Sequence, residues 1–227
     1  MPTSSRHGSP ILWKGERLFG FHRSKMGGAP LFLVEGYADV ATAHQAGIPN
    51  CVGVSSAGVT EKHLQLILKY KIPHVVLCLD ADAGGWRGIK TFVDLLDRVK
   101  PPSWFLTEIM YIPAGEDDPD AFIRKYGPAA FQQLPKTDVF SWKLDQLVKK
   151  LASKQDLYNQ IVELIRKEES PLRRFQMATI ASAVLQLPAH VLYDEAAVRS
   201  AALHIDPQRR PAVPDLVDDR IVFATPL

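Results

Sequence analysis

Two aspartates, Asp80 and Asp82, end a short apolar run and are followed closely by paired glycines, in the sequence LDADAGG. In an extended segment, side chains two residues apart point the same way, so these carboxylates would lie side by side. Paired hard oxygen ligands suit a divalent metal ion. An aspartate-rich turn can instead cap the helix that follows it, and the pair alone does not decide between the two interpretations.

Further acidic residues follow two other apolar runs. Glu35 and Asp39 follow the first run, in VEGYAD, and Asp118 and Asp120 follow the last one, in EDDPD. If these runs are neighbouring strands, the carboxylates converge on one edge of a sheet, where their repulsion would be costly without cations. Mg²⁺ prefers carboxylates, water and substrate phosphates, so the pattern predicts phosphoryl or nucleotidyl transfer. On this interpretation the aspartates hold the metal, and the glycines leave space beside it.

The segments around these acids alternate between strand and helix patterns. Apolar runs rich in β-branched residues predict strands at residues 31–34, 50–56, 74–79 and 104–113, with helices at 39–50, 60–71 and 86–99 between them. Thr60 is the expected N-cap of the second helix. Because strands and helices alternate, we expect an α/β fold with a mostly parallel sheet flanked by helices. Ligands bind at the carboxyl ends of the strands in such sheets, which is where the acids stand.

From Asp120 onward the pattern becomes helical, which suggests a helical subdomain from about residue 138. Amphipathic segments predict helices at residues 120–134, 140–151, 155–170, 172–187 and 190–204. We therefore divide the chain into a lead-in (1–29), an α/β domain (30–137), a helical subdomain (138–205) and a flexible, proline-rich tail (206–227).

Composition limits the class of protein. A chain of 227 residues with 46% hydrophobic composition can bury a substantial core. The net charge of +2 does not itself indicate a polyanionic partner, although basic residues gather in residues 1–30. Cys51 and Cys78 lack the spacing of a zinc site or a disulfide framework, which fits a reducing cytoplasm. No segment has the apolar length of a signal peptide or a membrane helix, so we expect a cytoplasmic protein without a membrane partner.

Three motifs in this order resemble the Toprim catalytic domain of bacterial-type DNA primases, which make short RNA primers on single-stranded DNA during replication. They are VEGYADVATAHQAGI, LCLDADAGG and DDPDAFIRKYG. The upstream segment SPILWKGERLFGF resembles the connection between the basic subdomain of a primase and its Toprim domain. The resemblance covers residues 9 to about 135 well, and the helices to about residue 205 more loosely. It implies a Toprim-like sheet followed by the helical subdomain of a primase, without the zinc-binding and helicase-binding modules.

The resemblance also implies a role for each acid. Glu35 would be the principal acid for metal and proton management, and Asp80 and Asp82 would be metal ligands for Mg²⁺ or Mn²⁺. The metal cluster would be completed by Asp118, Asp120 and Asp39. For Asp39, capping of the following helix is an equal alternative.

Two lysines are implied to contact substrate. Lys14 matches a family lysine near the phosphates of the incoming nucleotide, so it is a candidate for catalysis and for substrate binding, with a solvated turn lysine as the alternative. Lys25 is a second candidate for substrate binding. The implied partners are a single-stranded DNA template, nucleoside triphosphates, and a replicative helicase or a separate template-binding subunit.

Two other classes of function remain open. A Toprim nuclease or topoisomerase-like enzyme would use the same acids to cleave DNA, but the DPD motif with its following RKYG and the Lys14 segment favour a primase. A non-catalytic nucleic-acid or helicase-docking module is the second alternative. Clustered carboxylates argue against it, because a docking surface has no use for them.

Three tryptophans of the chain are expected to pack against other protein groups. Aromatic platforms bind single strands, so Trp86 at the start of a helix could stack on a nucleobase, but we expect it to pack against the protein. Trp104 and Trp142 are expected in the core.

Overall fold

The computed structural model describes residues 16–24, 30–55, 58–80, 82–113, 115–116 and 118–202. The chain divides into two compact units, Met1–Val139 and Phe140–Leu227. The lead-in expected at residues 1–29 is described at residues 16–24, and the tail expected at 206–227 lies outside the described residues.

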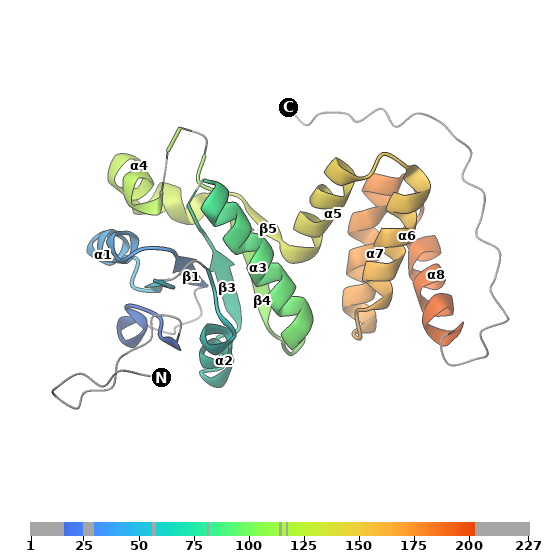
Figure 1. Ribbon diagram of the computed structural model, residues 1–227, viewed down its shortest axis with the longest axis horizontal. Helices are drawn as coiled ribbons and strands as arrows, with labels where there is room; N and C mark the ends of the chain where they lie inside the picture. The colour runs from blue at the N-terminus through green and yellow to red at the C-terminus, as the bar shows by residue number, and fades with distance from the viewer. Residues whose placement is uncertain are drawn as a thin grey trace, which may run out of the picture. The chain divides into compact units, whose positions relative to one another are not determined.

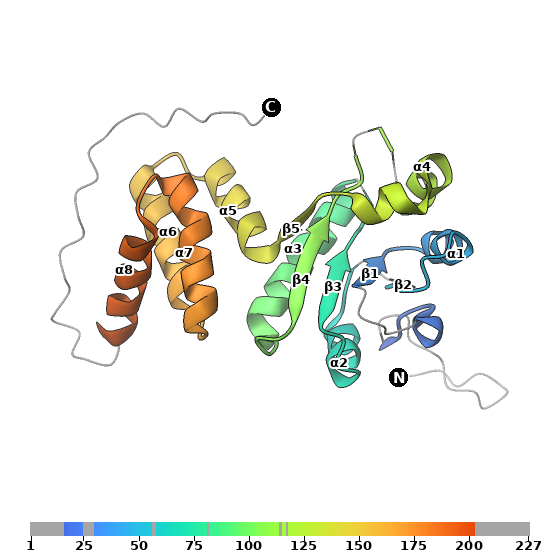
Figure 2. The ribbon, with the colours of Figure 1, turned by 180° about the vertical axis from the view of Figure 1, so that it is seen from behind.

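The first unit is built on one five-stranded sheet with the strand order β2–β1–β3–β4–β5 (Figures 1 and 2). The strands are β1 (Leu31–Val34), β2 (Cys51–Gly53), β3 (His74–Leu77), β4 (Leu106–Met110) and β5 (Lys136–Asp138). The first four pair in parallel, and β5 pairs antiparallel with β4. The expected α/β class with a mostly parallel sheet is therefore confirmed.

Helices cover both faces of this sheet. They are α1 (Tyr37–Gln45), α2 (Glu61–Lys69), α3 (Ala83–Val99) and α4 (Pro119–Gln133). Helix α3 lies in front of the sheet in Figure 1 and behind β4 in Figure 2. Val40 of α1 and Phe122 of α4 pack with Phe32 and Val76 in one buried cluster. Because side chains alternate along a strand, this cluster forms on one face while the intervening strand residues face the other.

The elements of this unit occur in the predicted order, but β5 was not predicted and several bounds differ. Helix α1 spans Tyr37–Gln45 instead of 39–50, and β2 and β4 are shorter than predicted. The residues Leu31–Val34 form β1 as predicted, and the Thr60 side chain accepts the His63 N–H as the N-cap of α2. Strand β5 was not predicted, because its three residues are half-buried and carry no apolar alternation. Helix α3 begins at Ala83, three residues before the predicted start, because Asp82 caps it.

The second unit is helical, as predicted. It contains α5 (Val139–Lys150), α6 (Lys154–Arg166), α7 (Pro171–Leu185) and α8 (Ala189–Ala202). Its core is formed largely by α6, whose Leu157, Ile161 and Ile165 are buried against residues of the other three helices. Ser153 and Ser170 cap α6 and α7 by accepting backbone N–H groups, which explains where these two helices begin.

The tryptophans divide between core and surface. Trp142 is buried, as expected, but Trp104 is 46% exposed, so its placement in the core was wrong. Trp104 lies in the loop before β4 and packs edge-on against Phe105, with ring centroids 6.1 Å apart. Among the described residues, no helix has the length and apolar character needed to cross a membrane.

Candidate active site

The predicted acids gather at the carboxyl edge of the sheet because β1 and β3 are adjacent parallel strands. Glu35 directly follows β1, and Asp80 lies three residues beyond the end of β3. The Cys78 N–H still donates to the Leu33 carbonyl at 2.9 Å, so the chain remains paired with β1 almost as far as Asp80. The topology therefore delivers both carboxylates to the same edge.

Glu35 is held by backbone contacts on the β2 side. The Ser55 N–H donates to the Glu35 carbonyl at 3.0 Å, which extends the pairing of β1 and β2 past their ends. Burial raises the pKa of the Glu35 carboxyl, and the charges of Asp82 and Asp39 raise it further. Glu35 is therefore a group that can hold a proton more readily than an exposed glutamate.

Asp80 carries a buried carboxylate whose pKa is strongly raised. One of its carboxylate oxygens, Oδ1, is buried and has no hydrogen-bond partner among the described residues. Burial raises the pKa of Asp80 to about 7, with Glu35 making the largest charge contribution, followed by Asp39, Asp118 and Asp82. A buried carboxylate oxygen without a donor is costly, and a cation would offset that cost.

Asp82 caps α3, so the capping interpretation of the DAD turn holds for this residue. Its Oδ1 accepts the Gly85 N–H at 2.7 Å. A Cβ added at Gly85 would lie 2.0 Å from the Asp80 carbonyl oxygen. The expectation that the glycines leave space beside a metal is therefore wrong for Gly85, because the Asp80 backbone fills that space.

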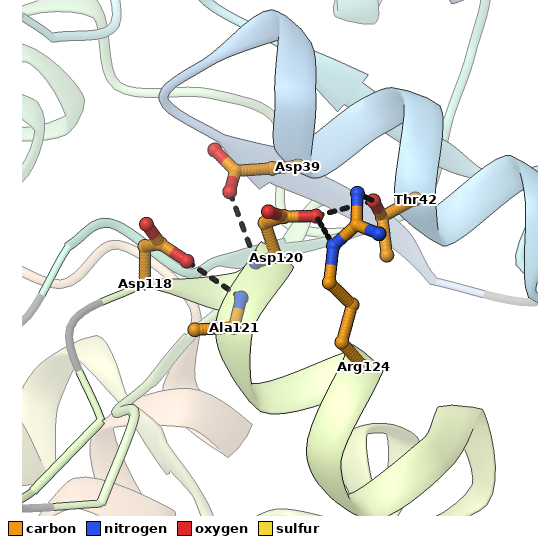
Figure 3. A network of polar contacts seen from close by, with 6 residues as sticks. All are labelled: Asp39, Thr42, Asp118, Asp120, Ala121 and Arg124. Atoms are coloured by element: carbon orange, nitrogen blue, oxygen red, sulfur yellow. Dashed lines mark hydrogen bonds and ion pairs between the residues drawn. The ribbon is translucent and has the colours of Figure 1, made fainter.

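The carboxylate of Asp39 accepts hydrogen bonds from two backbone groups. Its Oδ2 accepts the Gly36 N–H at 2.8 Å, and its Oδ1 accepts the Asp120 N–H at 3.1 Å, which Figure 3 shows. Burial raises the pKa of Asp39 in spite of these two bonds, and the charges of Asp118 and Asp120 add to the rise. The first bond matches the helix-capping alternative, although Asp39 lies inside α1 and Gly36 is the N-cap.

Asp120 and Asp118 organise the start of α4. Asp118 is its N-cap and accepts the Ala121 N–H at 2.7 Å. Asp120 Oδ1 accepts hydrogen bonds from the Thr42 hydroxyl and from Arg124 Nε, the latter at 2.7 Å. Arg124 Nη2 also donates to the Thr42 hydroxyl at 2.9 Å, so the three side chains close a small network (Figure 3). The hydrogen bond from Thr42 makes the largest contribution to lowering the pKa of Asp120. The hydrogen bond and the charge of Arg124 lower it further.

The structure thus brings Glu35, Asp80 and Asp82 to one edge and places Asp39 and Asp120 in the packing between α1 and α4. Within the part of the chain that the structure describes, no three Asp, Glu, His or Cys side chains stand close enough to hold a metal ion as placed. The acids nevertheless influence one another through charge. The two predicted lysines, Lys14 and Lys25, lie outside the described residues.

The donor set itself fits a hard divalent cation. Its candidate ligands are carboxylate oxygens, and one of them is the buried, unpartnered Oδ1 of Asp80. Oxygen donors suit Mg²⁺ or Mn²⁺, whereas thiolates and imidazoles would favour other metals.

Sequence reasoning missed three residues near these acids. Thr42 and Arg124 join Asp120, and only the spacing of Asp120 and Arg124 by four residues on a helix was a usable signal. Ser55 follows β2 in a left-handed conformation, with φ 53°, and its Oγ is buried without a hydrogen-bond partner among the described residues. Nothing in the local sequence pattern indicates that conformation.

Comparison with known proteins places these features in context. Residues 32–123 match a family described as Toprim-like. The DNA primase of Enterococcus faecalis is 30% identical over 193 residues, which are 80% of this chain and 30% of that relative. The DNA primase of Escherichia coli K12 is 32% identical over 129 residues, 54% of this chain and 21% of that relative. The chain therefore spans less than a third of the length of these curated relatives.

Solved structures show the same fold. A DNA primase domain from Pseudomonas aeruginosa superposes with a TM-score of 0.65 at 23% identity, covering 83% of this chain and 61% of that one. The DnaG primase catalytic domain bound to single-stranded DNA gives a TM-score of 0.65 at 23% identity, covering 78% of this chain and 58% of that one.

Proposed function

Because residues 32–123 form a Toprim-like domain and the chain has the fold of a DNA primase catalytic core, we propose that it catalyses nucleotidyl transfer in primer synthesis. The resemblance to bacterial-type primases that the three motifs predicted is confirmed by these similarities. In the proposed reaction, the 3′-hydroxyl of a nucleotide attacks the α-phosphate of a nucleoside triphosphate. A new P–O bond forms, and the bond to pyrophosphate breaks.

The observation that carries this proposal is the buried, unpartnered Oδ1 of Asp80 among other carboxylates at one sheet edge. Glu35, Asp80 and Asp82 would hold Mg²⁺ or Mn²⁺. Such an ion, when bound, lowers the pKa of the attacking hydroxyl and offsets the charge of the departing pyrophosphate. Glu35, which directly follows β1 at this edge, is also the carboxylate proposed to receive the proton of that hydroxyl.

Asp39 and Asp120 take a positioning role in this proposal instead of the predicted role as metal ligands. Both oxygens of Asp39 already accept backbone N–H groups, and Asp120 is paired with Thr42 and Arg124. These contacts fix the start of α4 against α1. They therefore set the position of Asp118, the N-cap of α4, whose charge raises the pKa of Asp80.

The proposed partners follow the same reasoning. A related catalytic domain has been solved with single-stranded DNA, and we propose the same class of template here. Nucleoside triphosphates would be the substrates, with Lys14 and Lys25 as the predicted phosphate contacts. A replicative helicase or a separate template-binding subunit would complete the assembly.

The direct test is primer synthesis on single-stranded DNA with labelled nucleoside triphosphates and Mg²⁺ or Mn²⁺. Wild type is compared with Glu35→Gln and Asp80→Asn, and Asp94→Asn on the exposed side of α3 is the matched carboxylate-to-amide control. We expect product from wild type and Asp94→Asn and none from the two site variants. Cleavage of labelled DNA without nucleoside triphosphates, lost in the same two variants, would instead assign the site to a nuclease.

A further inference from the structure

Two aromatic rings stack at the carboxyl edge of the sheet, next to the acidic site. The ring centroids of Trp86 and Tyr111 are 5.3 Å apart, and the ring planes are inclined by 28°. Trp86 lies in the first turn of α3, where its backbone N–H donates to the Asp82 carbonyl at 3.1 Å. Tyr111 directly follows β4, the neighbour of the strand that leads to Asp80. The pair thus belongs to the same edge as the carboxylates.

Trp86 packs against Tyr111, as expected, but it is not buried in the core. The residue is 44% exposed although it is among the largest apolar side chains, whereas Ile89 and Phe92 on the same helix are buried. Tyr111 stacks against the indole and restrains its orientation. A large aromatic ring that is both restrained and open to solvent is the form that stacking surfaces for bases take.

We propose that the Trp86–Tyr111 pair is a stacking platform for a nucleobase. The proposal rests on the proposed function, because the acids beside the platform are the groups assigned to the metal, and Mg²⁺ in such sites also binds substrate phosphates. A nucleotide carries its base and its phosphates on one ribose, so a site that engages the phosphates places a base nearby. Every nucleobase offers a π-face, so the platform would not select one base.

Two sources could supply that base, an incoming nucleoside triphosphate or the single-stranded template. The chemistry of stacking is the same for both. The experiment therefore uses one probe of each kind, a fluorescein-labelled dT₁₆ oligonucleotide and GTP with Mg²⁺, and measures binding to the full chain by anisotropy and by calorimetry.

The variants are Trp86→Ala, Trp86→Phe and the control Trp104→Ala. Trp104 is exposed to the same degree, 46% against 44%, but precedes β4 at the opposite edge of the sheet. We expect Trp86→Ala to weaken at least one probe by about fivefold or more, Trp86→Phe to retain most of the affinity, and Trp104→Ala to stay within about twofold. Loss confined to the oligonucleotide assigns a template base, and loss confined to GTP assigns the incoming base.

Two further readouts separate a platform from general damage. Thermal unfolding should be nearly unchanged in Trp86→Phe, and saturating probe should quench wild-type tryptophan fluorescence more strongly than that of Trp86→Phe. Equal affinities of wild type and Trp86→Ala for both probes, an equal loss in Trp104→Ala, or no binding by wild type would each overturn the platform.

Primer synthesis by wild type and Asp80→Asn is measured in parallel. Synthesis that depends on Asp80, with probe binding unaffected by Trp86→Ala, would retain the proposed function and remove the platform. Binding that depends on Trp86, in a protein that makes no primer, would retain the platform and remove the proposed function.

Discussion

Asp39 accepts the backbone N–H of Asp120 at 3.1 Å, across 81 residues of sequence. The same carboxylate accepts the Gly36 N–H, so it joins the first turns of α1 and α4. Asp39 is 5% exposed, and its pKa is raised chiefly by burial. Asp39 therefore acts first as a hydrogen-bond acceptor that connects α1 and α4. These two hydrogen bonds fix the position from which its charge raises the pKa of Asp80.

Asp39→Asn should destabilise the first unit without a large loss of metal affinity. An amide supplies one acceptor oxygen, so one of the two backbone N–H groups would lose its partner or face the amide NH₂. We expect a loss of about 1–3 kcal/mol in the free energy of unfolding, measured by urea denaturation. In Mn²⁺ titrations of the folded protein, Asp80→Asn should lose far more affinity than Asp39→Asn. Equal losses of Mn²⁺ affinity would return Asp39 to the set of metal ligands.

Local patterns in the sequence predicted most of the first unit, because its central strands are short apolar runs between capped helices. Leu31–Val34 was predicted with the observed bounds. Strand β5 was not, since Lys136–Asp138 becomes a strand only through pairing with β4. The charge signal at the three strand ends was enough to predict the gathering of Glu35 and Asp80, because parallel neighbours bring their carboxyl ends together.

The finer arrangement of the site depends on contacts that no local pattern contains. The bond from Asp120 to Asp39 joins residues far apart in sequence, so it could not be read from either motif. The left-handed backbone of Ser55 and the exposure of Trp104 likewise depend on what surrounds each residue. The motifs therefore predicted that Glu35 and Asp80 meet at one edge, and tertiary packing decided that Asp39 and Asp120 pair with protein groups while Asp80 Oδ1 has no donor among the described residues.

Gly85→Ala should be strongly destabilising, whereas Gly84→Ala should not. A Cβ at position 85 would meet the Asp80 carbonyl oxygen at 2.0 Å, so the start of α3 or the site backbone must move. At position 84 the nearest atom is Asp82 Oδ1 at 3.0 Å, a side-chain atom that needs to shift by only a few tenths of an ångström and can still cap α3. We expect a loss of about 1–3 kcal/mol or more for Gly85→Ala and less than about 1 kcal/mol for Gly84→Ala, by urea denaturation. Similar losses in both would show that α3 shifts freely at its first turn.

Ser55→Gly should raise stability. Ser55 has φ 53°, a conformation that glycine adopts without strain, and its buried Oγ has no partner among the described residues. We expect a gain of up to about 1 kcal/mol, reduced by the extra freedom of glycine in the unfolded chain. The midpoint of urea denaturation measures it. A loss of stability would show that the hydroxyl makes a contact that outweighs the backbone strain.

The stability of the metal-free protein should fall as the pH rises from about 4 to about 7. Asp80 has a pKa of about 7 in the folded chain, against an ordinary value of 3.8. Between these values the folded state binds more protons than the unfolded state, so raising the pH favours unfolding. Because Asp80 is only partly shielded from solvent, we expect it to change the free energy of unfolding by about 1 kcal/mol. This is less than the full pKa shift would give.

Urea denaturation at pH 5 and pH 8, in the presence of a chelator, measures this dependence. Asp80→Asn cannot titrate and should remove most of the difference, whereas Asp94→Asn should keep it. Mg²⁺ or Mn²⁺ should stabilise wild type more at pH 8 than at pH 5, because the ion competes with the proton for the same carboxylate. An equal pH dependence in wild type and Asp80→Asn without metal would mean that Asp80 is ionised well below pH 7 and needs no cation.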